Sequence, residues 1–360
     1  MERSPQIQYF LGANSPKGFY SLYHELIPLD TARAVYLLKG GPGCGKSTLM
    51  RRVGAAVEEA GHPAQYILCS GDPDSLDAVI FPTLHIALVD GTAPHVVEPT
   101  CPGAVESYLD LGSCYDREAL RPLRKELADC MSGYRGCYQR AYRCLGAAAE
   151  IRRDMRATLD TPPLQQRLAK RARGIAGREL PRTGGAPGAV TQRFLSGVTH
   201  KGVMTLFPTV QAQCQRVYEL ADTYGTGHTL LTCLLSAASA AGHPVIACPS
   251  PMEPDRLEHL LLPDLSLAFV TSTPESPFPA RPYRRLRLDA MADAALVRQQ
   301  RPRLRFARKV SAALVEEAVD SLAQAKAMHD RLEKLYNPHV DFGRVEMLAG
   351  QVTAEILALA

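Results

Sequence analysis

The segment AVYLLKGGPGCGKSTL at residues 34–49 constrains the fold of this chain more than any other stretch. Residues 34–38 are apolar, as in a buried parallel strand, and they lead directly into a glycine-rich turn. A helix is predicted from about Lys46 to Ala60, where Gly61 ends it. A strand, a tight turn and a helix in this order predict an α/β domain.

The turn matches the pattern G-x-x-x-x-G-K-S/T, in which each residue type has a physical role. Glycines let successive backbone N–H groups point toward phosphate oxygens, and the helix N-terminus adds the positive end of its dipole. Lys46 would reach the β- and γ-phosphates, Ser47 would bind Mg²⁺, and Thr48 would bond the α-phosphate. Nucleotide binding is therefore favoured over a glycine-rich turn that binds nothing. The predicted loop residues are Gly40, Gly41, Pro42, Gly43, Cys44, Gly45, Lys46, Ser47 and Thr48.

A second acidic element is predicted at the end of the apolar stretch LHIALVD, residues 84–90. Asp90 would end a strand and hold the magnesium ion, usually through water. The predicted catalytic residues are therefore Lys46 and Asp90, and the predicted metal ligands are Ser47 and Asp90. A turn-forming Asp-Gly pair is the alternative, and the distance along the chain from the loop favours the functional interpretation.

The residue after Asp90 is Gly91, whereas many motor ATPases place a glutamate there to polarise the attacking water. Fast hydrolysis is therefore not predicted. The other candidates for this role are Asp72, Asp74, His95 and Glu98. Asp72 and Asp74 follow the strand-like stretch AQYIL, which predicts a position at the carboxyl edge of the sheet, where ligands bind in open α/β folds. A role for Asp72 as the cap of a following helix fits the sequence equally well.

The chain also contains an internal repeat. Residues 61–89 align without a gap to residues 242–270 with 10 identities in 29 positions, where chance predicts about two. Both segments begin Gly-His-Pro, and both carry an acidic-Pro-Asp-x-Leu-acidic run, DPDSLD and EPDRLE. Upstream, FLGANSPKG at 10–18 matches FLSGVTHKG at 194–202, and the glycine-rich segment matches RVYELADTYGTGHTLL at 216–231. The repeat predicts two domains of one fold.

The second copy of the loop lacks several parts of a triphosphate site. The equivalent pairs are Gly40 and Asp222, Lys46 and His228, Ser47 and Thr229, and Asp90 and Thr271. The His228 imidazole is expected to be mostly neutral at pH 7, and the Asp222 carboxylate would repel phosphate. Tight binding of Mg·ATP is therefore predicted for the first copy alone.

A helical segment follows each α/β part. The predicted fold is α/β, with tandem three-layer α/β/α P-loop NTPase domains, mostly parallel sheets and a helical hairpin after each. The predicted domains are 1–182, with the intact loop and a helical insertion at about 116–180, and 193–360, with the degenerate loop and a C-terminal hairpin, joined by a linker at 183–192. A helical hairpin beside a phosphate loop closes on the nucleotide, serves as an interaction surface or only packs. The candidates for arginines that close on the nucleotide are Arg152, Arg153 and Arg156.

Lys17 and Lys201 precede equivalent glycines in the two copies. A structural role at the entry to the first helix of each copy is favoured, because amphipathic runs follow both lysines. The alternative is that each lysine reaches a phosphate across the domain interface.

Composition narrows the class of protein further. The chain is 46% hydrophobic and 22% charged, it has no apolar run of bilayer length and it begins without an apolar signal segment, so a cytoplasmic protein is expected. Cys130, Cys137 and Cys144 recur every seven residues and are expected to be small buried side chains rather than metal ligands. Basic residues dominate 151–182 and 281–309, where a solvated helix face or a phosphate-facing surface is favoured over a nucleic-acid surface.

These motifs resemble a family of bacterial proteins described as ATPases or ATP-binding proteins with duplicated P-loop domains. The resemblance is carried by FLGANSPKG, LLKGGPGCGKSTL, DPDSLD and ALVDGTAPHVVEP, and the repeat extends it over most of the chain. It implies a tandem P-loop fold and ATP as the nucleotide, and no established reaction. Related chains often keep a recognisable second loop, so the degenerate residues 222–229 depart from the pattern and argue against a two-site mechanism.

The predicted function is ATP binding with slow hydrolysis in the first copy and a regulatory or structural second copy. One alternative is a small-molecule kinase with Asp72 or Asp74 beside the acceptor. Another is a non-enzymatic module whose affinity for a partner changes with bound nucleotide. Besides ATP and Mg²⁺, the predicted partner is an unidentified protein or small molecule, with nucleic acid less favoured and no membrane.

Overall fold

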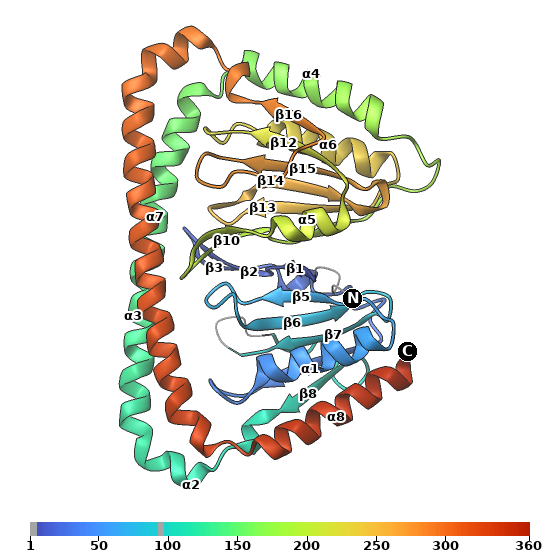
Figure 1. The fold of residues 1–360 in the computed structure, drawn as a ribbon, viewed down its shortest axis with the longest axis vertical. Coiled ribbons are helices and arrows are strands. Elements are labelled where there is room, and N and C mark those ends of the chain that lie inside the picture. The colour runs from blue at the N-terminus through green and yellow to red at the C-terminus, as the bar shows by residue number, and fades with distance from the viewer. Residues whose placement is uncertain (1–5, 93–96) are drawn as a thin grey trace.

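A computed structural model describes residues 6–92 and 97–360, which form two six-stranded sheets lying one beyond the other with two long helices along their side (Figure 1). The first sheet has the order β1 (Ile7–Tyr9), β5 (Gln65–Leu68), β6 (Leu76–Phe81), β7 (Ile86–Asp90), β4 (Ala34–Lys39), β8 (Glu106–Asp110). The second has the order β9 (Val190–Gln192), β13 (Val245–Ser250), β14 (Glu253–Leu262), β15 (Leu267–Ser272), β12 (Arg216–Ala221), β16 (Arg284–Arg287). Each strand of one sheet thus has its counterpart at the same place in the other.

Both sheets are mixed and mostly parallel. In the first sheet β6 runs antiparallel to β5 and β7, and the other neighbours are parallel. In the second sheet β14 is likewise antiparallel to β13 and β15. The five residues of β7 are all buried, as expected for a strand covered on both faces. The predicted pair of α/β units with mostly parallel sheets is therefore confirmed, with one antiparallel strand inside each sheet as an addition.

Helices cover the sheets and connect the two halves. They are α1 (Lys46–Glu59), α2 (Arg117–Leu120), α3 (Arg124–Leu159), α4 (Pro162–Glu179), α5 (Phe207–Gln213), α6 (His228–Ala240), α7 (Ala294–Tyr336) and α8 (Phe342–Leu359). Two hairpins complete the fold, β2 (Gly12–Ser15) with β3 (Gly18–Ser21) and β10 (Ser196–Thr199) with β11 (Gly202–Thr205). In the described residues, none of these helices has the length and apolar character needed to cross a membrane.

The helices that follow each sheet do not form the predicted hairpins. Instead, α3 and α7 pack along each other in opposite directions over both halves (Figure 1). Their side chains pair at both ends, with Arg303 bonded to Asp154 and Arg331 bonded to Glu126. A helix of 36 residues and one of 43 are each long enough to pass both sheets, because an α-helix rises about 1.5 Å per residue.

The shorter helices are exchanged between the halves. Helix α4 follows the first sheet in the chain but packs on α6 of the second half, where Leu168 is fully buried. Helix α8 follows the second sheet but packs on α1 of the first half, where Ile356 is fully buried. Each α/β unit is therefore completed by a helix from the other half of the sequence.

The two halves meet around equivalent residues. The amide of Phe10 donates to the carbonyl of Phe194 and the amide of Phe194 donates to the carbonyl of Phe10, both at 2.9 Å. These phenylalanines occupy the same position of the repeat. When equivalent residues pair with each other, an approximate two-fold axis passes between them, as in a symmetric dimer. The structure is a dimer-like arrangement within one chain.

The repeated lysines follow the same symmetry. Lys17 of the first half pairs with Asp255 of the second at 2.6 Å, and Lys201 of the second half pairs with Asp74 of the first at 2.5 Å. Both lysines lie at the turns of the β2–β3 and β10–β11 hairpins, beside glycines with φ of +93° and +112°. Each lysine therefore reaches across the interface, as in the less favoured of the two interpretations. Its partner there is a carboxylate and not a phosphate.

Candidate phosphate-binding site

The glycine-rich loop lies between β4 and α1 and has a backbone that only glycine adopts easily. Gly43 has φ of +71° and Gly45 has φ of +85°, values that L-residues rarely take. A Cβ atom at Gly43 would lie 2.3 Å from Asn337 Oδ1, and one at Gly40 would lie 2.6 Å from Cys44 Sγ. The loop therefore depends on its glycines for both its turn and its close packing.

The Lys46 ammonium points back into the loop. Its Nζ donates to the carbonyl oxygens of Gly40 at 2.7 Å and Gly41 at 2.9 Å. The same Nζ lies 3.5 Å from Asp90 Oδ2, and both side chains are 12% exposed. The two predicted catalytic residues are therefore brought together by the adjacent parallel strands β4 and β7.

The predicted metal ligands line the same cavity as the ammonium group. Ser47 Oγ accepts from the amide of Leu76 at 3.0 Å, and Asp90 Oδ1 accepts from the amide of Thr92 at 2.9 Å. A hydroxyl and a carboxylate beside a phosphate loop are oxygen donors of the kind that Mg²⁺ takes together with phosphates. The donor set fits a magnesium ion bound with a nucleotide.

The cavity has a volume of about 820 Å³ and is enclosed from two sides. One side is the whole predicted loop with Arg51, Asp90, Thr92 and the turn between β5 and β6. The other side is made by the long helices and the segment after them: Met131, Tyr134, Tyr138, Lys326, His329, Leu332, Glu333, Asn337 and Phe342. The second half of the chain thus contributes much of the wall facing the first loop.

The remaining candidate acids divide between the cavity and the surface. Asp72 and Asp74 line the cavity, where Asp72 Oδ2 accepts from Ser75 Oγ at 2.9 Å. The alternative role of Asp72 as a helix cap is wrong, because β6 and no helix follows this turn. Glu98 is bonded to Lys39 and Tyr108 and is not part of the cavity lining. His95 lies outside the described residues.

Asp77 is a cavity residue that sequence reasoning missed. It is 3% exposed, and Oδ2 accepts from the Tyr23 hydroxyl at 2.9 Å. Because β6 is antiparallel to β7 and Ala78 pairs with Val89, Asp77 and Asp90 are next to each other at the carboxyl edge of the sheet. The last aspartate of DPDSLD was the available signal, but an antiparallel strand at this place was not predicted.

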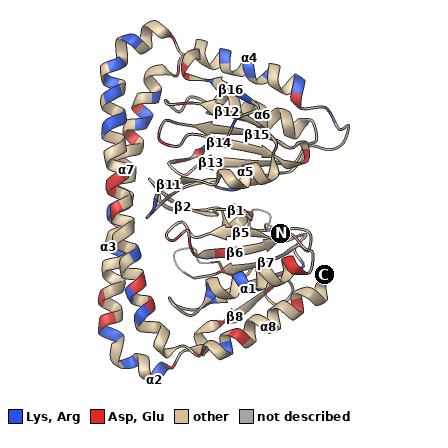
Figure 2. Cartoon of the chain, viewed as in Figure 1, with Lys and Arg blue, Asp and Glu red and all other residues tan. Residues whose placement is uncertain are grey.

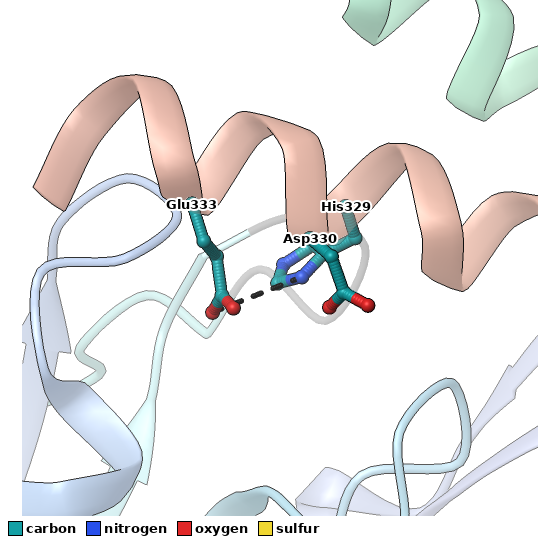
Figure 3. Close-up of side chains that lie close together, drawn as sticks. All are labelled: His329, Asp330 and Glu333. Atoms are coloured by element: carbon teal, nitrogen blue, oxygen red, sulfur yellow. Dashed lines mark ion pairs between the residues drawn. The ribbon is translucent and has the colours of Figure 1, made fainter.

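Three polar side chains of α7 lie close together, His329, Asp330 and Glu333, and of these His329 and Glu333 line the cavity (Figure 3). His329 Nδ1 lies 3.8 Å from Glu333 Oε1, and burial lowers the pKa of His329 below its usual value. Asp330 already accepts a hydrogen bond from Lys326. Lys326 therefore occupies the Asp330 carboxylate, and His329 and Glu333 form a polar patch of the cavity wall.

The second loop is occupied by its own side chain. The Asp222 carboxylate accepts from the amides of Thr226 at 3.0 Å and Gly227 at 2.7 Å. Its equivalent in the first loop is Gly40, which has no side chain. His228 Nδ1 accepts from the amide of Leu257 at 3.0 Å, and burial together with the charge of Arg256 lowers the pKa of His228.

Of the predicted closing arginines, Arg156 lies near the second loop, where its Nη1 would be 3.8 Å from a Cβ atom at Gly225. Arg156 is 8% exposed and forms a two-pronged ion pair with Glu253. Arg152 Nε donates to Ser311 Oγ at 2.8 Å, and Arg153 bonds to Glu150. These three arginines do not line the cavity of the first loop, so the expectation that they close on its nucleotide is wrong. The direction of α3 carries residues 152–156 away from the first half (Figure 1).

Comparisons of the chain with protein-family models, with curated proteins and with solved structures found no match. Lys46, Ser47, Asp90 and Asp77 converge on one cavity, and the glycine loop forms its base.

Proposed function

We propose that the first half of the chain is a three-layer P-loop domain that binds Mg·ATP, and that the second half is a degenerate copy with a regulatory or structural role. The observation that carries this proposal is the convergence of the Lys46 ammonium, the Ser47 hydroxyl and the Asp90 carboxylate on one cavity above the glycine loop. Ser47 and Asp90 would hold the magnesium ion, which when bound neutralises phosphate charge. Loop amides and Lys46 would bind the phosphates.

The reaction we propose is slow ATP hydrolysis. Gly91 stands where many ATPases carry a water-activating acid, which argues against fast turnover. Asp77 is the carboxylate beside Asp90 on the neighbouring strand, and its hydrogen bond from Tyr23 holds it in place. In this proposal Asp77 orients the attacking water, and α3 and α7 limit the access of bulk water to the cavity.

A test of nucleotide binding compares variants at equivalent positions of the two loops. Lys46→Ala should abolish the rise in unfolding temperature that saturating Mg·ATP causes, because it removes the cation that contacts the phosphates. His228→Ala should retain this rise. Ligand at about 100 times its Kd stabilises a protein by about 2.7 kcal/mol, which a thermal melt resolves. Equal loss of ATP-induced stabilisation in both variants would contradict a single site.

Phosphoryl transfer to a small molecule is a second candidate. The cavity extends beyond the loop to Asp72, Asp74, Tyr134 and Tyr138, which leaves polar and aromatic surface for an acceptor. A carboxylate near the acceptor hydroxyl suits this chemistry. ADP formation that requires an added metabolite would support transfer, whereas ADP formation that is indifferent to every metabolite would support hydrolysis.

A further inference from the structure

Lys326 is a cation that the second half of the chain brings to the cavity of the first. It lies on α7, its side chain is 22% exposed, and its Nζ is 3.5 Å from Asp72 Oδ2. A hydrogen bond to Asp330, one turn along the helix, holds it in this position. Burial lowers the pKa of Lys326, but the Asp330 hydrogen bond and the Asp72 charge outweigh burial and raise the pKa above its usual value. The side chain is charged at neutral pH.

A short chain of contacts connects Lys326 to the magnesium side of the loop. Its partner Asp72 accepts from Ser75 Oγ at 2.9 Å, and the next residue, Leu76, donates its amide to Ser47 Oγ at 3.0 Å. Lys326, Ser47 and Asp90 line the same cavity, and this chain of contacts runs from Lys326 through the turn between β5 and β6 to Ser47.

Helix α7 is also in direct contact with the loop. A Cβ atom at Gly43 would lie 3.2 Å from the Cα of Glu333, so the helix backbone packs against this glycine. Lys326 precedes Glu333 by seven residues, which places it on the same face about 10 Å further along the helix. The helix thus passes over the loop with one cation directed at the cavity.

The other cations of the cavity wall are differently placed. Lys46 belongs to the loop itself, and the exposed Arg51 donates to the carbonyl of Asp74. Among the described lining residues that lie on α3 or α7, Lys326 is the one lysine or arginine. The carboxylates of Asp72 and Asp330 bind the Lys326 ammonium group beside the cavity. An anion of higher charge in the cavity would compete with Asp72 for this ammonium group.

We propose that Lys326 is a terminal-phosphate contact: it exchanges Asp72 for the γ-phosphate when a nucleoside triphosphate occupies the first loop. This inference rests on the proposed nucleotide site. A lysine is a compact point charge that binds phosphate without demanding a planar geometry. Because a diphosphate lacks the γ-phosphate, Lys326 would distinguish the two nucleotides and would make α7 sensitive to which one is bound.

The experiment measures the Kd values of ADP and of a non-hydrolysable ATP analogue by titration calorimetry, with Mg²⁺ present. Lys326→Met keeps much of the aliphatic stem and removes the charge. It should weaken binding of the ATP analogue roughly tenfold, the effect of losing one charged hydrogen bond, and change ADP binding less than about twofold. Lys334→Ala, an exposed lysine on the same helix, is the matched control and should leave both Kd values unchanged.

The outcomes separate the inference from the proposed function. Unchanged affinity for both nucleotides in Lys326→Met, or an equal loss for both, would overturn the terminal-phosphate contact while leaving nucleotide binding intact. Failure of the wild-type chain to bind either nucleotide would overturn the proposed function and the inference with it. Unfolding temperatures of the variants show whether each is folded.

Discussion

At the scale of residues, one of the differences between the two loops is a carboxylate that occupies the second loop. Asp222 directs its carboxylate at the amides of Thr226 and Gly227, in the position equivalent to Gly40 of the first loop. Asp222 is 4% exposed, so the acceptor for these two loop amides is a buried carboxylate of the protein itself. A buried amide without an acceptor is costly, so the Asp222 carboxylate stabilises the loop by accepting from both amides.

Replacing this carboxylate should destabilise the chain. In Asp222→Ala the two amides lose their acceptor, and we expect the free energy of unfolding to fall by about 1–3 kcal/mol. Urea denaturation measures the change. Asp264→Ala removes an exposed aspartate from the same half and should have an effect below about 0.5 kcal/mol. An Asp222→Ala variant as stable as the wild type would show that the carboxylate does not support the loop.

At the scale of elements, the exchange of α4 and α8 decides which parts of the sequence stabilise which half. Helix α8 contributes Val345, Val352 and Ile356 to the core of the first unit. Helix α4 contributes Leu164 and Leu168 to the core of the second. Helix α4, which follows the first sheet in the chain, therefore stabilises the second unit. Helix α8, which follows the second sheet, stabilises the first.

Matched core substitutions should reveal this exchange. Ile356→Ala and Leu168→Ala each remove a fully buried side chain and should each cost about 2–5 kcal/mol. Amide hydrogen exchange should rise in α1 for Ile356→Ala and in α6 for Leu168→Ala, because those helices lose their packing partners. Faster exchange in the half that is adjacent in sequence would contradict the exchanged arrangement.

Local sequence patterns predicted the elements that carry the glycine loop. They did not predict the elements that form the facing wall of the cavity. The apolar run before Gly40 and the helix from Lys46 depend on neighbouring residues, and both were predicted within a residue or two. The strand ending at Asp90 was predicted for the same reason. The antiparallel direction of β6 and the partner of each long helix depend on contacts far apart in sequence, which periodicity does not encode. Asp77, Lys326 and His329 were therefore missed as cavity residues.

At the scale of the whole molecule, the strands follow the approximate two-fold axis but the charge does not. The two basic stretches, 151–182 and 281–309, come together at one end, around α4, β16 and the start of α7 (Figure 2). The first loop lies in the other half (Figure 1). This basic surface is therefore separate from the proposed nucleotide site, and a phosphate-facing role at the first loop does not apply to it.

The shared interface predicts that the two halves unfold together. Phe10 and Phe194 are both fully buried, and one continuous apolar core includes residues of both sheets. Calorimetry should show one transition, and Phe194→Ala should lower the free energy of unfolding by about 3–5 kcal/mol without splitting it. Phe306→Ala, at a site 69% exposed, is the control and should have little effect. Two separate transitions, with one shifted, would indicate independent halves.

The position of α8 has a consequence for how the chain is made. Residues 46–59 leave the ribosome early, whereas the helix that packs on them, 342–359, is synthesised after the whole of the second half. At about 5–20 residues per second, roughly 15–60 s separate the two. During that interval the face of α1 that packs on α8 has no native cover, and Lys326 and Asn337 have not yet been translated. Until then the cavity beside the glycine loop lacks part of its wall, and a chaperone that shields α1 is expected to improve the yield of folded protein.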